Sequence, residues 1–333
     1  SGLTWLNNAL QAFEELGDSE AMAKTAMQIG MVARALGRYP DAERAYQRAL
    51  DYYIDTGNLI WQANVLNNLG VLQHLRGNYE GASGSFEKAI QYARIGGYAR
   101  LEAYALTSVG DLYRDLDAVE ESQEAYHQAR PIALRVNDRF LLFYLDLVEA
   151  SLARLQGQAA RADRLIAIAS EAADKSTSAF QQNLCRLEHA GAAIARHAYR
   201  DALPELEAGL DYFEKEGHRV EGLRTHLYLA VARRAIADRQ AAQAHLNRVF
   251  AASVEPGSSN PIAVTGRELR FHLEAMEQDP DFERAASAIL RLVTAFERQI
   301  PSLRRQLRHQ SQTSPLGPPK SVSQTLGKIQ VKI

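Results

Sequence analysis

A small residue recurs every 40 positions along this chain, and further columns of residues keep the same phase. The first column is Gly30, Gly70, Gly110, Ala150, Ala190 and Ala230. Twelve positions later a second small column holds Ala42, Ala82, Ser122, Ala162, Ala202 and Ala242. Four positions further on, a large apolar column holds Tyr46, Phe86, Tyr126, Ile166, Leu206 and Leu246. Several columns sharing one period of this length are typical of a solenoid, in which each unit buries its apolar face by stacking on its neighbours.

The spacing within each 40-residue unit predicts two helices. Within a unit, the columns are three, four or seven residues apart, and residues at these offsets lie on one face of a helix. Glycines interrupt the pattern twice in the early units, as at Gly37 and Gly57, and glycine supplies the left-handed residue that ends many helices. Each unit is therefore predicted to be a hairpin of a first helix, A, and a second helix, B, which the small columns allow to approach closely.

The best copy of the unit resembles the tetratricopeptide repeat. Its residues match that family's leucine–glycine pair, its G-x-Y-x-x-A segment and its later aromatic and alanine: Leu69, Gly70, Gly77, Tyr79, Ala82, Phe86 and Ala89. The resemblance covers residues 3–298. It implies an all-α fold, a right-handed superhelix of about seven repeats with helices A on the concave face. Because the period of 40 exceeds the usual 34 residues, both helices are expected to be longer.

Copies four to six depart from the pattern at two positions of helix A. These positions carry polar residues, namely Asp146, Glu149, Arg186, His189 and His226. Either the helices rotate by about one residue, so that Leu147, Leu187 and Leu227 supply the apolar face, or the polar groups line a site.

The phase of the pattern predicts the domain boundaries. Residues 3–16 match helix B of a truncated repeat, and residues 17–298 are predicted to form the solenoid, with a three-residue slip before the seventh copy. Residues 299–325 are predicted to be a basic linker rich in proline and serine, and residues 326–333 alternate like the first strand of a further domain. We expect the chain to be a fragment of a longer protein.

Charge is unevenly distributed along the chain. The net charge is −2, but no acidic residue follows Glu297, and seven of the 38 basic residues do. Residues 1–297 therefore carry 31 basic and 40 acidic side chains, a net charge of −9. We expect the basic tail to lie along the groove of its own acidic solenoid, or to associate with a neighbouring molecule.

The motifs of common enzymes are absent from the sequence. There is no glycine-rich phosphate loop, no H-E-x-x-H, no G-x-S-x-G and no cysteine pair, because Cys185 is the only cysteine. We predict no catalytic residue, no metal ligand and no cofactor. A lone cysteine and the lack of a membrane-spanning apolar run favour a cytoplasmic protein.

Two sets of residues are candidates for a binding groove on the concave face. The first is a column near the end of helix A, made up of Arg34, His74, Arg114, Arg154, Ile194 and Arg234. These cations either complement the helix dipole or form a basic ladder near Asn67 and Asp111 that faces an anionic ligand. The second set is Asn64, Asn67 and Asn68. Resemblance to peptide-binding tetratricopeptide repeats implies that they hold the backbone of a ligand; alternatively, Asn67 and Asn68 bond to the adjacent helix.

The long period and the tail resemble parts of bacterial regulators. Repeats of about 40 residues are similar to the sensor arrays of signal-transduction ATPases related to the maltotriose-responsive activator. Residues 326–331 resemble the opening strand of the winged-helix module in the antibiotic-regulatory-protein activators. This resemblance implies a ligand- or protein-binding sensor domain of a transcriptional regulator, which contacts DNA only through an absent downstream domain. The alternative is a free-standing tetratricopeptide adaptor or peptide receptor.

Overall fold

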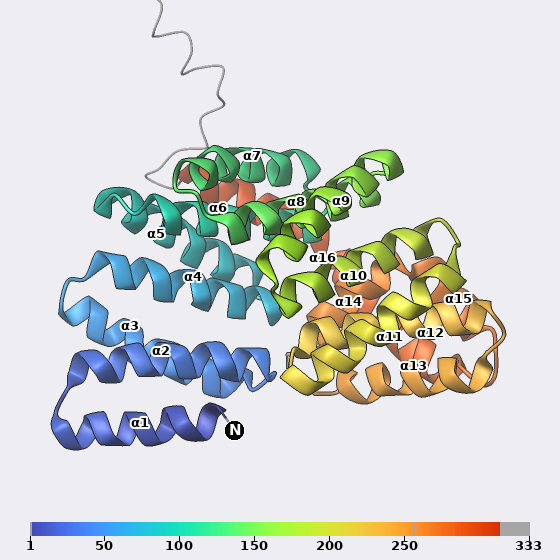
Figure 1. Ribbon diagram of the computed structural model, residues 1–333, viewed down its shortest axis with the longest axis horizontal. Helices are drawn as coiled ribbons and strands as arrows, with labels where there is room; N and C mark the ends of the chain where they lie inside the picture. Colours follow the sequence, from blue (N-terminus) through green and yellow to red (C-terminus); the bar gives the residue numbers. More distant parts are fainter. Residues whose placement is uncertain (1, 256, 314–333) are drawn as a thin grey trace, which may run out of the picture.

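The helices of the molecule stack into a curved solenoid (Figure 1). The structure, a computed structural model, describes residues 2–255 and 257–313, and in this part of the chain it contains sixteen helices and no strand. None of these helices combines the length and the apolar character needed to cross a membrane.

One helix precedes seven hairpins, as the sequence predicts. The single helix is α1 (Gly2–Leu16). The first six hairpins are α2 (Ser19–Ala35) with α3 (Tyr39–Asp55), α4 (Leu59–Leu75) with α5 (Tyr79–Gly96), α6 (Ala99–Asp115) with α7 (Val119–Arg135), α8 (Arg139–Leu155) with α9 (Ala159–Ser176), α10 (Ala179–Ala195) with α11 (Tyr199–Glu216), and α12 (Arg219–Ala235) with α13 (Arg239–Ser253). In the seventh, helix A is divided into α14 (Ser259–Glu268) and α15 (Arg270–Glu277), and helix B is α16 (Glu283–Thr313). The fold is therefore an all-α tetratricopeptide-type solenoid.

The small columns lie where helix A and helix B of one hairpin meet. A Cβ atom added to Gly70 on α4 would come within 2.6 Å of the Phe86 ring on α5, and Gly30 and Gly110 face Tyr46 and Tyr126 in the same way. The alanines of the second column are fully buried: Ala42, Ala82, Ala162, Ala202 and Ala242. The period of 40 thus records one repeated close contact between paired helices.

Helices A of the fourth to sixth hairpins present the replacement apolar face. Leu147, Leu187 and Leu227 are all buried, as the rotation predicts. Two of the displaced polar residues are also buried, and each has a partner: Asp146 pairs with Arg130, and His226 contacts Glu214 and His245.

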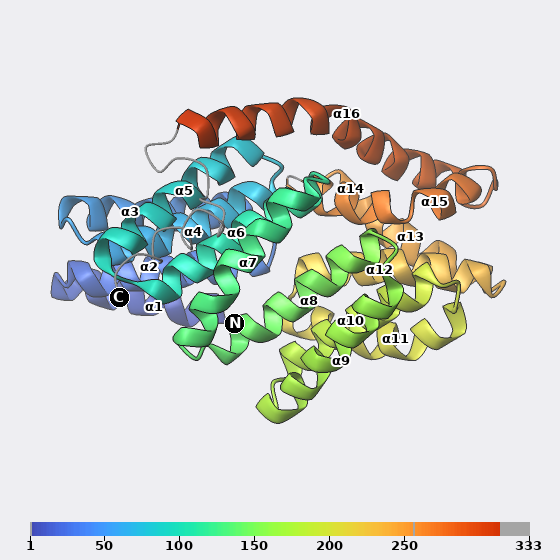
Figure 2. The ribbon, with the colours of Figure 1, turned by 90° about the horizontal axis from the view of Figure 1, so that it is seen from above.

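The seventh hairpin closes the superhelix by packing against the second and third hairpins. Phe296 on α16 stacks on Tyr79 on α5 with ring centroids 5.7 Å apart. A single buried cluster joins the two regions: Tyr79, Ala82, Phe86, Leu112, Leu116, Ala263, Phe296, Ile300 and Leu307. Figure 2 shows α16 running along one side of the solenoid from α15 toward α5. The Tyr79 hydroxyl also donates to Asn260, 181 residues further along, so the chain returns to its early repeats after about four and a half units of 40 residues.

The prediction of a linker beginning at residue 299 is wrong for residues 299–313. Helix α16 continues through Pro301 to Thr313. The reason is that Ile300 and Leu307 are buried against the early hairpins. Their seven-residue spacing continues the apolar face of the helix, although the composition has already become basic. The rest of the predicted linker and the predicted strand at residues 326–333 lie outside the described residues.

Candidate functional site on the concave face

Two of the first three members of the basic column, His74 and Arg114, lie in ion pairs with aspartates. His74 Nε2 is 2.9 Å from Asp115 Oδ2, and Arg114 lies 3.0 Å from Asp111 and 3.1 Å from Asp115. Arg34, half-buried on α2, lies beside the Tyr46 hydroxyl. Helix A of each hairpin supplies these groups from its last turn, and carboxylates of the same or the next hairpin lie against His74 and Arg114.

Asp111 and Asp115 each interact with several neighbouring side chains through their carboxylate oxygens. Asp111 accepts hydrogen bonds from Tyr126 at 2.7 Å and from Tyr144 at 2.9 Å, in addition to the one from Arg114. Burial acts to raise the pKa of Asp115, but Arg114 and His74 outweigh it and hold that pKa at about 2. The Asp115 carboxylate is therefore charged at neutral pH, and both carboxylates are paired within the molecule.

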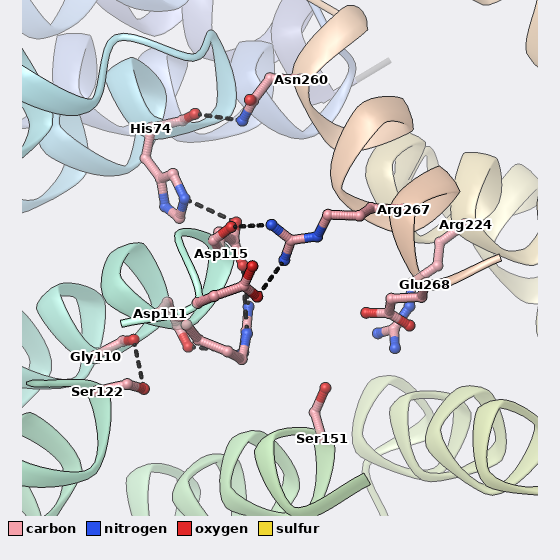
Figure 3. A network of polar contacts seen from close by, with 12 residues as sticks. His74, Gly110, Asp111, Asp115, Ser122, Ser151, Arg224, Asn260, Arg267 and Glu268 are labelled. Atoms are coloured by element: carbon pink, nitrogen blue, oxygen red, sulfur yellow. Dashed lines mark hydrogen bonds and ion pairs between the residues drawn. The ribbon is translucent and has the colours of Figure 1, made fainter. Parts of the chain in front are cut away.

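Helix α14 covers this polar cluster (Figure 3). Asn260 donates through Nδ2 to the His74 carbonyl at 2.9 Å and accepts from the Tyr79 hydroxyl at 3.2 Å. Arg267 donates to the Asp115 carbonyl at 3.0 Å and pairs with Asp117 at 3.0 Å. The side chains of Asn260 and Arg267 thus occupy the position at which an anionic ligand would meet the first half of the column.

The second half of the column meets the other side of α14. Arg154 lies 2.9 Å from Glu268, which also accepts from the Tyr228 hydroxyl at 3.0 Å. Close by, Arg224 bonds to Glu188 at 2.6 Å. Burial acts to raise the pKa of Glu268, yet Arg154 and Arg224 outweigh it, so the pKa lies below its usual value. Two cations and two carboxylates are thus paired here, with Glu188 buried and Arg154, Arg224 and Glu268 partly buried.

An open pocket remains beside this second set. Its volume is about 490 Å³, and it lies where α14 gives way to α15. Its lining includes Arg154, Ile194, Tyr228, Glu268, Phe271 and His272, and we call it the α14–α15 pocket. The Phe271 side chain is 74 % exposed. The pocket combines apolar residues, the exposed Phe271 ring and the paired charges of Arg154 and Glu268. These are features of a site that buries a side chain of a partner.

Arg114 and Arg154 do not cap carbonyls of their own helices, nor do they line one open anionic site. Arg154 reaches the α14–α15 pocket, whereas Arg114 is enclosed by Asp111 and Asp115. Arg234, the last member of the column, donates to the Ala275 carbonyl at 2.7 Å and thereby holds α15.

The asparagine set is engaged in structural hydrogen bonds. Asn68 donates to the carbonyl and to the side-chain oxygen of Asn64, both at 3.0 Å. Asn67 accepts from the Ser108 hydroxyl of α6 at 3.2 Å. For Asn67 this is the alternative in which the side chain bonds to the adjacent helix, and none of the three lines the α14–α15 pocket.

A second concavity lies between the third and fourth hairpins. It measures about 570 Å³ and is bordered by Glu124 and His127 of α7, Gln156 of the α8–α9 connection, and Arg130, which bonds to Glu149 at 2.7 Å. Its lining holds three carboxylates, those of Glu120, Glu124 and Glu149, and two arginines, Arg130 and Arg161, and it includes no exposed phenyl ring like that of Phe271.

Sequence reasoning missed the aromatic side of the α14–α15 pocket. Phe271 and His272 belong to the copy whose phase slips by three residues. That slip is the signal that could have indicated an irregular helix A, and the structure places the division at Leu269.

The described residues contain no group of three or more histidine, cysteine or acidic side chains that could hold a metal ion. Cys185 is buried, and its burial raises the pKa of the thiol to about 11. A thiol with so high a pKa is a poor nucleophile.

Comparison with known proteins gives the same architecture. A family model described as the tetratricopeptide repeat matches residues 1–55 and 21–95. Among solved structures, the Rap protein complexed with competence and sporulation factor is similar, with 12 % identity, a TM-score of 0.62, and coverage of 92 % of this chain and 98 % of that one. The apo form of RapI has 13 % identity, a TM-score of 0.55, and coverage of 86 % of this chain and 99 % of that one. No curated protein matches the sequence. At these identities the similarity establishes the tetratricopeptide-type fold.

Proposed function

We propose that this protein is a protein- or peptide-binding scaffold, and that a partner side chain enters the α14–α15 pocket. The observation that carries the proposal is the pocket itself, an opening of about 490 Å³ on a concave face whose other half is filled by α14. Burial of the exposed Phe271 ring by a partner would supply the apolar contact that dominates many interfaces. No catalytic step forms part of the proposal.

The similar structures support this class of function. The Rap protein is described as a complex with competence and sporulation factor, and this chain shares its fold over most of its length. A solenoid with longer helices than the common repeat offers a deep concave face for such a partner.

Selection from a random peptide library displayed on phage tests the proposal. Peptides enriched on the wild-type protein should bind the Phe271→Ala and His272→Ala variants on the order of tenfold more weakly, the loss expected for an anchoring contact. Trp5→Ala is the matched control, because Trp5 is 78 % exposed on α1, away from the pocket. Equal binding by all variants would contradict a site at this pocket.

We further propose that the scaffold is the sensor segment of a bacterial transcriptional regulator. This finer proposal is supported by the period of 40 residues and by residues 326–331, which lie outside the described residues. The alternative is a free-standing adaptor. The flanking reading frame distinguishes the two, because a regulator of this type should encode a nucleotide-binding motif upstream and a winged helix downstream, and an adaptor should encode neither.

A further inference from the structure

Helix α16 has two opposite faces with the same seven-residue spacing. The inner face packs on the solenoid with Phe282, Ala286, Ile289, Val293, Phe296, Ile300, Leu303 and Leu307. The outer face carries Arg284, Arg291, Arg298 and Arg305, which are all exposed. Each arginine follows an inner residue by two positions, which is a rotation of about 200° around the helix. The arginines therefore form a stripe on the side of α16 opposite its packed face, and we call these four residues the arginine stripe. Arg284, at its start, also lies over the Phe250 ring of α13, 5.4 Å from the ring centroid.

The arginine stripe is not neutralised by the rest of the described chain. Arg291, Arg298 and Arg305 form no ion pair with any described residue. Arg308 lies on the same helix but outside the stripe, and it pairs with Glu121. Glu297, the last acidic residue of the chain, is already paired with Arg270. Residues 314–333 contain no carboxylate side chain that could pair with the stripe.

The stripe has the dimensions of a helix surface. Seven residues span about 10 Å along a helix, so the four arginines cover about 31 Å. Between them, on the same face, lie the small residues Ala288, Ala295 and Ser302. Small residues allow the backbone of a second helix to approach closely, while arginines reach past it to carboxylates on its flanks.

We propose that the arginine stripe of α16 binds an acidic helix of a partner protein. The partner would carry carboxylates at seven-residue spacing over about six turns, matching the arginines one to one. A nucleic acid fits less well, because residues 1–297 carry a net charge of −9 and a long polyanion leaving the stripe would be repelled by that surface. This site is separate from the α14–α15 pocket and does not depend on the function proposed for it.

Two synthetic peptides test the match of spacing. Both are alanine-based helices of about 24 residues with the same number of glutamates; in one the glutamates repeat every seven residues, and in the other they are scrambled around the helix. The chain should bind the first peptide more tightly, and the affinity should fall as salt concentration rises, because exposed ion pairs are screened.

Charge reversal identifies the residues responsible. The Arg291→Glu/Arg298→Glu/Arg305→Glu variant should lose binding of the matched peptide by roughly tenfold or more, as expected from three exposed pairs that each contribute a few tenths to one kcal/mol. The control variant is Arg135→Glu/Arg164→Glu/Arg200→Glu, which makes the same change of net charge at exposed arginines of other helices. Circular dichroism of both variants verifies the fold.

Three outcomes would overturn the proposal. The first is equal binding of the matched and scrambled peptides. The second is equal loss of binding in the stripe variant and the control variant. The third is tighter binding of duplex DNA than of the matched peptide, which would make the stripe a surface for nucleic acid.

Discussion

At the scale of single residues, the closest packing is that of the glycines in helices A on the rings of helices B. The Gly70→Ala variant places a methyl group within 2.6 Å of the Phe86 ring. We expect a loss of about 1–3 kcal/mol of unfolding free energy, because neither the ring nor the helix backbone can move without disturbing the next hairpin. Urea unfolding measures this loss.

The control for this variant is Gly222→Ala on α12, where an added Cβ atom meets nothing within 4 Å. Alanine is a better helix former than glycine by about 0.5–1 kcal/mol, so this variant should be at least as stable as the wild type. A Gly70→Ala variant as stable as Gly222→Ala would show that the first column is small for another reason.

A buried pair of histidines should make the sixth hairpin sensitive to acid. His226 and His245 contact each other through Nδ1 at 2.9 Å, and His226 Nε2 lies 3.2 Å from Glu214. Since Glu214 accepts from His226 Nε2, His245 is the donor in the contact between the two rings, and both rings are neutral.

The pH dependence follows from the pKa values of this pair. Burial lowers the pKa of His226, and burial together with the neighbouring His226 lowers the pKa of His245 to about 4. The unfolded chain, with a histidine pKa of about 6.5, then binds more protons, so stability falls as pH drops from about 6.5 toward 4. The urea midpoint should therefore be lower at pH 5 than at pH 7. A His245→Phe variant should show a smaller decrease; the same decrease in both proteins would assign it to other groups.

The backbone of the hairpin turns shows where sequence reasoning reaches its limit at this scale. Gly37 and Gly77 have a left-handed backbone conformation, as their residue type predicts. Asp117, His197 and Ala237 occupy the same position in later hairpins and hold the same conformation, although they are not glycines. Ala237 has no intrinsic preference for it. Stacking of the hairpins imposes the conformation, and a local pattern does not contain that information.

At the scale of elements, α16 is held to the early hairpins by its apolar face. Phe296 is buried and stacks on Tyr79, so the Phe296→Ala variant should lose about 3–5 kcal/mol of unfolding free energy. Phe271→Ala, the same change at an exposed ring of the same hairpin, should lose little. Thermal unfolding of the two variants checks the difference, and equal melting temperatures would contradict the docking of α16.

The candidate site was predicted in part at this scale. The period placed the basic column in the last turns of helices A, and Arg154 does line a pocket there. The sequence could not show that His74 and Arg154 are already paired, because the partner of His74 lies 41 residues away, and Arg154 is paired with a residue of the seventh hairpin. Contacts of that range depend on the curvature of the whole solenoid.

At the scale of the whole molecule, the seventh hairpin closes the superhelix, and the shape of the α14–α15 pocket depends on that closure. The sequence predicted the number of hairpins, but it did not predict that the last one would fill half of the concave face. Polar side chains on both sides of α14 hold the superhelix closed. Asn260 bonds to the second hairpin and Arg267 to the third, and Glu268 bonds to the fourth and the sixth. The open pocket is the part of the groove that this arrangement leaves.

An engineered disulfide tests closure most directly. A Cβ atom on Gly77 would lie 3.5 Å from the Cβ atom of Asn260, at the short end of the range that a disulfide spans. The native Cys185 is buried, so it should not interfere. Under mild oxidation without denaturant, the Gly77→Cys/Asn260→Cys variant should form an intramolecular disulfide, seen as loss of both engineered thiols by mass spectrometry. If both thiols stay free while the protein is folded, the seventh hairpin does not rest on the second, and the closed superhelix is contradicted.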